Sequence, residues 1–490
     1  MSGKRLVQHP SRLFIDGRWI DASSSSMIDV IDSATEEPFL SVAEARADDV
    51  TKAVNSAREA FDSGPWPRMS PSERSTYLRA IARALEKRAL EHAELWTREA
   101  GVIFSAAKSR MPGLSETFDY YADLAEAYAF EERHKPQNGG DVALVVREPV
   151  GVVAAIVGWN GAPGLVTTKV APALMAGCSL VLKASPEAPG AAYIMAEACE
   201  EAGLPSGVLN IVTCGRETSE SLVRNPGVDK VTFTGSTATG RRIAAICGER
   251  IGRVTLELGG KSPALVLDDY DIDIAAKAIA SRATFMTGQV CYSLTRIIVT
   301  RSRHDALVDA LSDNFKSVAV GDPFDPRIQM GPLANRAQYE RVQGYIARGI
   351  DEGAKLVSGG KRPARLDRGY FIEPTVFGNV DNASTIGREE IFGPVLCVIP
   401  VADEEQALEV ANDTIYGLNA TVFSNDPDKA YAFARRIRSG TIGHNGVRRE
   451  HRLPFGGFKQ SGLGREGGHE GVTPYLETKV IILDGVPQHS

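Results

Sequence analysis

The sequence has no long apolar run, no excess of positive charge and no clustered cysteines. No stretch approaches the roughly 20 uninterrupted apolar residues that a membrane-spanning helix needs, and the first twenty residues lack the apolar core of a signal peptide. The 55 Lys and Arg residues are outnumbered by 62 Asp and Glu, so the formal net charge is −7. This balance argues against a general role on nucleic acid or membrane surfaces. We therefore expect a cytoplasmic protein that binds neither nucleic acid nor membrane.

Paired or metal-spaced cysteines are also missing. The chain has six cysteines: Cys178, Cys199, Cys214, Cys247, Cys291 and Cys397. They form no CxxC pair and show no metal-ligand spacing, which predicts free thiols in a reducing compartment and no metal site.

The length and the order of apolar segments predict a multidomain α/β protein. A chain of 490 residues is too long for one ordinary core, and 43% hydrophobic with 24% charged residues is typical of a globular protein. Apolar runs at 152–157, 179–183, 208–212 and 230–234 alternate with helical segments such as 190–201 and 238–247. This alternation predicts a parallel sheet covered on both faces, as in Rossmann-type nucleotide-binding domains. It restarts after Cys291, with runs such as 395–401 and 404–412, and so predicts a second α/β domain.

Two segments outside this alternation predict a small β-arm. Residues 141–153 alternate and carry β-branched side chains, which is typical of an extended hairpin. Residues 476–483 form a final apolar strand, which we expect to pair with this arm. Such an arm can pair with the sheet of another subunit, so we expect a homo-oligomer, a dimer or a tetramer.

The stretch Thr287-Gly288-Gln289-Val290-Cys291-Tyr292 is the first candidate for chemistry. Cys291 follows a helical run at 274–285, and the nearby glycine leaves the sulfur accessible to a substrate. Local amides would stabilise a thiolate and the oxyanion that it generates. The alternative is a small buried hydrophobe, the commonest fate of a free cysteine.

Two further side chains have the chemistry that such a cysteine requires. Glu257 ends a strand and is followed by Gly259 and Gly260, which we expect to leave room for water and substrate beside a general base. The alternative is a salt-bridged or solvated glutamate. Asn160 directly follows the run at 152–157, and its neutral amide is a suitable donor to a developing oxyanion. The alternative is a turn-forming asparagine.

A candidate cofactor site follows the run at 230–234. Gly235 would let the backbone approach a phosphate, and Ser236 and Gly240 lie in the first turn of the next helix, whose N-terminus attracts negative charge. Lys183, which closes another strand, could hydrogen-bond a ribose. The alternatives are an ordinary strand-to-helix turn and a solvated lysine.

Five motifs together resemble the aldehyde dehydrogenase superfamily, in order and approximate spacing, over residues 13–483. They are Asn160, Glu257-Leu258-Gly259-Gly260, Gly288-Gln289-Val290-Cys291, Glu390-Ile391-Phe392-Gly393-Pro394 and Pro454-Phe455-Gly456-Gly457-Phe458-Lys459. The resemblance implies oxidation of an aldehyde to the acid with NAD or NADP as hydride acceptor. A cysteine thiohemiacetal and a thioester would be the intermediates. It also implies a cofactor domain at 1–128 and 149–258, a catalytic domain at 259–462, and an arm with the C-terminal strand at 129–148 and 463–490.

The resemblance also implies roles for individual residues. Cys291 is expected to be the nucleophile, Glu257 the base that hydrolyses the thioester, and Asn160 an oxyanion donor with the backbone N–H of Cys291. Lys169 and Glu466 match a pair that helps to move the proton of the base to solvent. The positions expected to contact the cofactor are Trp159, Lys183, Glu187, Gly235, Ser236, Gly240, Glu390 and Phe392.

The sequence departs from the family pattern in two places. Pro186 replaces a glutamate expected three residues after Lys183, with Glu187 next to it, so the choice of NAD over NADP rests on Glu187. Gly158 and Gly161 replace a proline and an aromatic residue beside Asn160, which predicts a wider pocket.

The loop before Pro454 contains Arg448, Arg449 and Arg452, with His451. We hypothesise that at least one of the arginines faces the substrate tunnel and holds a carboxylate or phosphate on the aldehyde. The alternative is a solvated charge run, or one that bridges subunits through Glu450.

Two other functions compete with a hydrolytic dehydrogenase. One is a catalytically silent structural or binding protein on the same fold, which would be expected to lose the nucleophile or the base. The other is an esterase that uses only Cys291 and Glu257, and it would not depend on nicotinamide.

Overall fold

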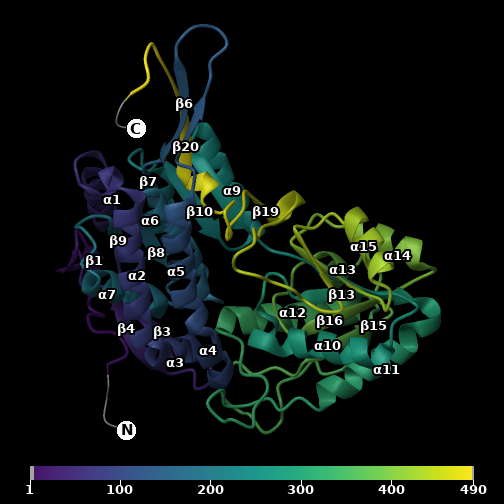
Figure 1. Cartoon of the computed structure of the whole chain (residues 1–490). Coiled ribbons are helices and arrows are strands. Elements are labelled where there is room, and N and C mark those ends of the chain that lie inside the picture. Colours follow the sequence, from purple (N-terminus) through teal and green to yellow (C-terminus); the bar gives the residue numbers. More distant parts are fainter. Residues whose placement is uncertain (1–4, 488–490) are drawn as a thin grey trace.

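The structure is a computed structural model that describes residues 5–487. It contains two large sheets, each built around parallel strands and covered by helices (Figure 1). A third sheet, of three strands, projects from the body as an arm (Figure 1). The α/β class predicted from the alternation of apolar runs and helical segments is confirmed.

The first sheet has eight strands in the order β19-β11-β10-β7-β8-β9-β1-β2, and the five from β11 to β9 are mutually parallel. In that order the bounds are Gly462–Leu463, Arg253–Glu257, Lys230–Thr234, Val152–Ile156, Ser179–Ala184, Leu209–Thr213, Arg12–Ile15 and Arg18–Asp21. From β7 the chain moves outward through β8 and β9, then returns to the other side of β7 as β10. The strand order therefore reverses between β7 and β10, the position where open α/β sheets bind their ligands.

Helices cover both faces of this sheet because β7 is apolar on both. Val153 and Ala155 face one helical layer, while Val152, Ala154 and Ile156 face the other. The first layer is α2 (Pro71–Lys87), α5 (Pro112–Ala127), α6 (Ala162–Ala176) and α7 (Gly190–Glu201). The second is α1 (Ala47–Asp62), α8 (Arg216–Arg224) and α9 (Thr237–Glu249). Helices α3 (Ala89–Ala100) and α4 (Phe104–Arg110) pack against each other beside α5 and α7.

The second sheet has seven strands in the order β14-β15-β16-β13-β12-β17-β18, and only the β14–β15 pair is antiparallel. In that order the bounds are Lys355–Ser358, Thr375–Gly378, Val395–Val401, Leu294–Thr300, Ser262–Val266, Asn419–Phe423 and Thr441–His444. Its helices are α10 (Ile272–Thr284) and α11 (Arg301–Lys316) on one face, with α12 (Arg336–Asp351), α14 (Glu404–Asn412) and α15 (Pro427–Arg436) on the other. The short helix α13 (Thr385–Arg388) packs against α12.

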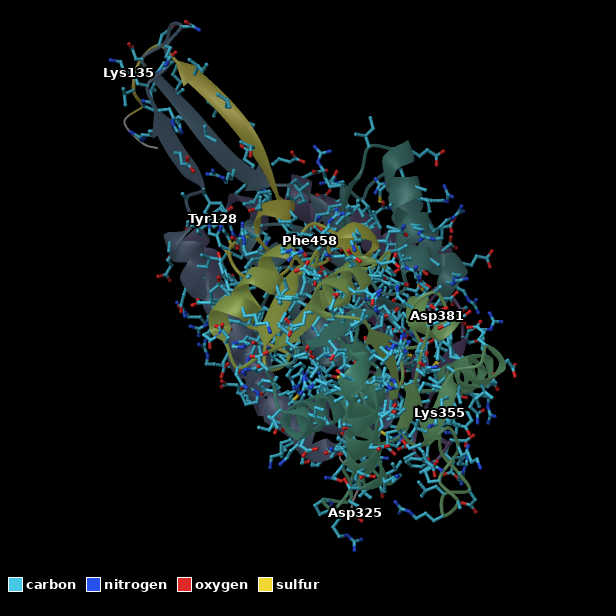
Figure 2. The ribbon with its side chains drawn as sticks, turned by 90° about the vertical axis from the view of Figure 1, so that its right-hand side faces the viewer. Tyr128, Lys135, Asp325, Lys355, Asp381 and Phe458 are labelled. Carbon is cyan, nitrogen blue, oxygen red and sulfur yellow. The ribbon has the colours of Figure 1, made fainter. Side chains whose placement is uncertain are left out.

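The arm consists of β5 (Glu131–His134), β6 (Val142–Pro149) and β20 (Leu476–Leu483). All eight residues of β20 pair antiparallel with β6, so the predicted pairing of the last strand with the arm is confirmed. Figure 2 shows Lys135 at the tip of the arm and Tyr128 near its base. The expected extended segment 141–153 is divided at Gly151, where φ is 124°, so that Val152 begins β7 instead of continuing the arm.

The remaining elements are small. Strands β3 (Met27–Ile31) and β4 (Pro38–Ala43) form a two-stranded sheet. Four short 3₁₀ turns are η1 (Trp66–Arg68), η2 (Phe285–Gly288), η3 (Lys459–Ser461) and η4 (Thr473–Tyr475). Within residues 5–487, no helix combines the length and the apolar character that a membrane span requires.

Candidate functional site

The loop that carries Cys291 has an unusual backbone. It follows α10 through η2, where Met286, Thr287 and Gly288 have φ values of 50°, 55° and 71°. L-residues other than glycine rarely adopt this left-handed conformation, and for a β-branched residue such as Thr287 it is an outlier. Such strain persists only where the surrounding structure holds it in place.

Buried hydrogen bonds hold the loop in this shape. The hydroxyl of Thr287 lies 3.0 Å from the carbonyl oxygen of Gly331 and 3.1 Å from that of Pro332, and donates to this pair. Gln289 is buried, and its Oε1 accepts from the backbone N–H of Ala334 at 2.9 Å. The loop is therefore fastened to the segment 331–334, and Gln289 is a positioning residue whose role the sequence motif did not reveal.

A second contact packs the loop against the Glu390–Pro394 motif. A Cβ atom on Gly288 would lie 2.3 Å from the carbonyl carbon and oxygen of Gly393. Only glycine tolerates this close approach together with its positive φ. Two motifs about a hundred residues apart are thus in direct contact beside Cys291.

Cys291 differs from the other five cysteines because it is only half-buried, whereas they are buried. It lines a cavity of about 120 Å³ together with Asn160, Trp96 and Leu165. Burial raises the pKa of the Cys291 thiol to about 12, and the charge of Arg449 opposes this rise. At neutral pH the resting thiol is protonated and needs a base to act as a nucleophile.

Asn160 lies beside Cys291, in the loop between β7 and α6. Its side-chain Nδ2 donates to the carbonyl oxygen of Gln289 at 2.9 Å, and its own carbonyl accepts from Trp96 Nε1 at 2.8 Å. One N–H of the amide is thereby fixed, and the second remains available to the cavity. The sequence expectation that Asn160 and Cys291 lie together is met by this geometry.

Glu257 ends β11 and is buried. Neither of its carboxylate oxygens has a hydrogen-bond partner among the described residues. Burial, reinforced by the charge of Glu466, raises the pKa of Glu257 well above its ordinary value, while Lys169 and Arg449 act in the opposite direction. A carboxylate in this environment has a high affinity for a proton, as a general base requires.

Gly259 and Gly260, which follow Glu257, are required for a different reason from the expected one of leaving room beside the carboxylate. A Cβ atom on Gly259 would lie 2.2 Å from Oε2 of Glu390, and one on Gly260 would lie 2.5 Å from the carbonyl oxygen of Cys291. They make room for these neighbours and not for water and substrate beside Glu257. The glycine next to the Glu257 carboxylate is Gly456, whose Cβ would lie 2.7 Å from Oε1.

Lys169 and Glu466 form a buried ion pair near Glu257, although 297 residues separate them in the sequence. Lys169 in α6 also lies 3.3 Å from the hydroxyl of Thr232 in β10. Glu466 is positioned by its backbone, which exchanges two hydrogen bonds with Phe455. Three ionisable groups of mixed sign therefore lie close to one another in the interior.

The predicted cofactor residues lie along the switch point of the first sheet. Ser236 caps α9 by accepting from the backbone N–H of Thr239 at 3.3 Å, directly after β10. A Cβ atom on Gly240 would lie 2.4 Å from Leu258, so glycine lets α9 pack closely onto the strand end. Gly235 lies between β10 and α9.

Lys183 and Glu187 lie at the end of β8. Lys183 is buried, and no hydrogen-bond acceptor for its ammonium occurs among residues 5–487. Burial lowers the pKa of Lys183, and the charge of Glu187 opposes this. Glu187 is exposed and accepts a hydrogen bond from the Ser185 hydroxyl. Both side chains therefore lie where an adenosine ribose would be expected.

The other predicted cofactor residues come from the two sides of the Cys291 loop. The Glu390 carboxylate accepts from the backbone N–H of Gly260 at 3.0 Å, and burial raises the pKa of Glu390 to about 7. Trp159 and Phe392 meet edge to face, with ring centroids 5.5 Å apart. No group of three or more His, Cys, Asp or Glu side chains in the described part of the chain could hold a metal ion.

The arginine-rich loop divides into two kinds of residue. Arg449 lines the cavity of Cys291, as hypothesised for at least one of the three. Arg448 and Arg452 do not line it, although all three arginines are exposed in part to solvent. Arg452 packs instead over the ring of Tyr120, 5.9 Å from its centroid. Arg110, at the end of α4, also lines the cavity, and no sequence signal near the motifs identified it.

Comparison with known proteins agrees with the arrangement of Cys291, Asn160 and Glu257 described above. The family described as the aldehyde dehydrogenase family matches residues 19–481. The chain belongs to the aldehyde dehydrogenase family.

Individual relatives extend the similarity over the whole chain. Geranial dehydrogenase from Castellaniella defragrans is 43% identical over 474 residues, which cover 96% of this chain and 98% of the relative. The crystal structure of an aldehyde dehydrogenase from Mycobacterium tuberculosis, complexed with NAD+, superposes with a TM-score of 0.94 at 43% identity, covering 98% of this chain and 99% of the other. A cysteine-to-alanine variant of aldehyde dehydrogenase C from Pseudomonas syringae, complexed with NAD+ and octanal, has a TM-score of 0.94 at 38% identity and full coverage of both chains.

Proposed function

We propose that this aldehyde dehydrogenase family member oxidises an aldehyde to the carboxylic acid with NAD+ as hydride acceptor. The observation that carries the proposal is that the one half-buried cysteine, Cys291, opens into a cavity that Asn160 also lines. The unpaired carboxyl of Glu257 acts electrostatically on the same thiol. Nucleophile, oxyanion donor and base are therefore all present, which argues against a silent structural protein.

The residues at the switch point fit a dinucleotide. The N-terminus of α9 follows β10 directly and offers first-turn amides to a phosphate. Lys183 supplies a buried ammonium that has no hydrogen-bond partner among residues 5–487 and is suited to ribose hydroxyls. The Glu390 carboxylate accepts one hydrogen bond from the protein and has a second oxygen for the nicotinamide ribose. The bound cofactor would supply the acceptor for the hydride that leaves the substrate carbon.

Glu187 favours NAD over NADP in this proposal. Its carboxylate lies close enough to Lys183 to affect the pKa of that lysine, and it would repel a 2′-phosphate. Comparison of kcat/KM for the two cofactors tests this assignment, and a clear preference for NADP would remove Glu187 from the site.

The protein's own residues then divide the chemistry. Glu257 accepts the proton of Cys291 as the sulfur bonds to the carbonyl carbon, and the free N–H of Asn160 with the backbone N–H of Cys291 stabilises the oxyanion. After hydride loss the carbonyl carbon remains bound to Cys291 as a thioester. Glu257 takes a proton from the water that attacks this carbon, and the C–S bond breaks to release the acid. Lys169 and Glu466 carry protons from Glu257 toward solvent.

We also propose that the protein is a homo-oligomer, a dimer or a tetramer, assembled through the arm in the cytoplasm. The arm projects from the body (Figure 1) and exposes Val480 and Ile482 on β20, 60% and 58% accessible. Exposed apolar residues on a projecting strand are typical of a protein–protein contact. Sedimentation of the full chain tests the assembly.

A thiol substitution tests the catalytic proposal. Cys291→Ala should abolish production of reduced cofactor while leaving NAD+ binding nearly intact, because nucleophile and cofactor crevice are separate. Cys199→Ala is the matched control, since Cys199 is buried in α7 away from the cavity, and it should remain active. If Cys291→Ala retains most of the activity, the mechanism is refuted. If the wild type hydrolyses an ester without nicotinamide but oxidises no aldehyde, the esterase is supported instead.

A further inference from the structure

The cavity of Cys291 has two arginines on its wall that the proposed chemistry does not use. Arg449 comes from the loop between β18 and η3, and Arg110 comes from the end of α4. His451 lines the same cavity. Burial and the nearby charge of Arg449 lower the pKa of His451, so His451 is a neutral hydrogen-bonding group at pH 7, although the carboxylates of Glu450 and Glu116 oppose this.

Aromatic rings orient both guanidinium groups. The Cζ atom of Arg449 lies 4.5 Å from the ring centroid of Phe455 and 5.5 Å from that of Tyr292. The Cζ atom of Arg110 lies 4.4 Å from the ring centroid of Phe285. Stacking fixes the plane of a guanidinium and leaves N–H groups at its edge for a planar anion. In Arg449 one of these groups also interacts with the side chain of Tyr292.

Neither arginine has a carboxylate partner in the described part of the chain. Within residues 5–487, no ion pair joins Arg110 or Arg449 to an Asp or Glu side chain. Burial lowers the pKa of Arg110, Tyr292 opposes this, and the like charges of Arg282 and Arg449 lower it further. Such mutual repulsion beside a cavity would be relieved by a bound anion.

The rest of the wall is mainly apolar. Trp96, Met111, Leu114, Leu165 and Met286 line the same cavity as these arginines and Cys291. Gly161 leaves space on this wall, since a Cβ atom there would meet only Leu165, at 4.0 Å. The cavity therefore suits a molecule with an uncharged stem and one acidic end.

We propose that the substrate is an aldehyde with a carboxylate at the end remote from the carbonyl, and that Arg110 and Arg449 hold this carboxylate. The assignment rests on the proposed aldehyde oxidation and adds the substrate class. Bidentate arginine–carboxylate contacts place the carbonyl carbon at Cys291 by fixing the far end of the stem. The same cations disfavour aldehydes that carry a positive charge.

The alternative role for Arg449 is to stabilise the thiolate of Cys291, because its charge lowers the pKa of that thiol. This role would affect every aldehyde equally, whereas a carboxylate clamp affects only acidic ones. Arg110 is not among the largest influences on the pKa of Cys291, so it separates the two roles.

The test compares 6-oxohexanoate with its uncharged methyl ester, with NAD+ in excess, in the wild type, Arg110→Met and Arg449→Met. We expect the wild type to prefer the acid, and each variant to lose about tenfold to a hundredfold in kcat/KM for the acid while changing little for the ester. Arg448→Met is the matched control, since Arg448 lies one residue from Arg449 but outside the cavity, and it should keep the preference. Thermal unfolding of each variant confirms that it is folded.

The possible outcomes are distinguishable. Equal losses for acid and ester in Arg449→Met, with no effect of Arg110→Met, would assign Arg449 to thiolate stabilisation and overturn the clamp. A wild type that already prefers the ester would also overturn it. If neither aldehyde is oxidised with NAD+ or NADP+ while a panel of other aldehydes also fails, the proposed function itself is wrong.

Discussion

Replacement of Gln289 by Met tests whether the strained loop is what positions Cys291. The two side chains have similar volumes, so the change removes polar contacts and leaves little cavity. It deprives the buried N–H of Ala334 of its partner, at 2.9 Å in the native protein, whereas the carbonyl oxygen of Met286 loses the side-chain donor but keeps the hydrogen bond from the backbone N–H of residue 289. A buried polar group left unpaired costs roughly 1–3 kcal/mol, so the free energy of unfolding should fall by about 1–3 kcal/mol.

Activity should fall with stability, although Gln289 contacts no reacting atom. Its carbonyl oxygen anchors the Asn160 amide, and Cys291, two residues further along the chain, is the proposed nucleophile. A displacement on the order of 1 Å at such a centre can reduce the rate about a hundredfold, so kcat should drop at least tenfold. Urea denaturation followed by tryptophan fluorescence, together with kcat at saturating NAD+, measures both effects.

Thr287→Ser is the matched control in the same loop. Serine keeps the hydroxyl that bonds to the segment 331–334 and removes the β-branch from the left-handed position. It should therefore remain close to the wild type in stability and in kcat. If Gln289→Met changes the unfolding free energy by less than about 0.5 kcal/mol and leaves kcat intact, the loop is not held by these bonds.

Two further predictions concern charge. Asn160→Ala removes one oxyanion donor and should cost on the order of 3 kcal/mol, about a hundredfold in kcat; an effect confined to KM would assign Asn160 to ground-state binding. Burial raises the pKa of Glu99 from 4.5 to about 8, so the folded state holds a proton that the unfolded state has released, and stability falls as the pH rises through this range. Glu99→Gln should flatten that dependence in urea denaturation from pH 5 to pH 8, and a variant with an unchanged slope would contradict the assignment.

Local sequence determined much of the fold because periodicity and caps act within one element. The predicted helix at 190–201 and the strands at 230–234, 395–401 and 476–483 match α7, β10, β16 and β20 residue for residue. Their apolar spacing is decided within the segment itself. Shorter elements such as β15 (Thr375–Gly378) and β18 (Thr441–His444) were not predicted, since four residues carry too little periodicity and their pairing comes from neighbouring strands.

The sequence predicted those residues of the candidate site whose side-chain type and local motif indicate a chemical role. Cys291, Glu257 and Asn160 follow a helix or end a strand, and parallel strands bring such ends to one edge of a sheet. The sequence alone could not show why Gly259 and Gly260 are required. Their neighbours, Glu390 and the Cys291 carbonyl, come from other parts of the chain.

Only the tertiary structure decided which charges meet. Lys169 and Glu466 are 297 residues apart and become one buried pair because β19 returns the C-terminal segment to the edge of the first sheet beside β11. Arg110 and Arg449 line one cavity because the end of α4 lies near a loop that comes more than three hundred residues later in the sequence. The sequence determines the chemistry of each side chain. The desolvation and the neighbouring charges that shift its pKa depend on distances that only the packed chain establishes.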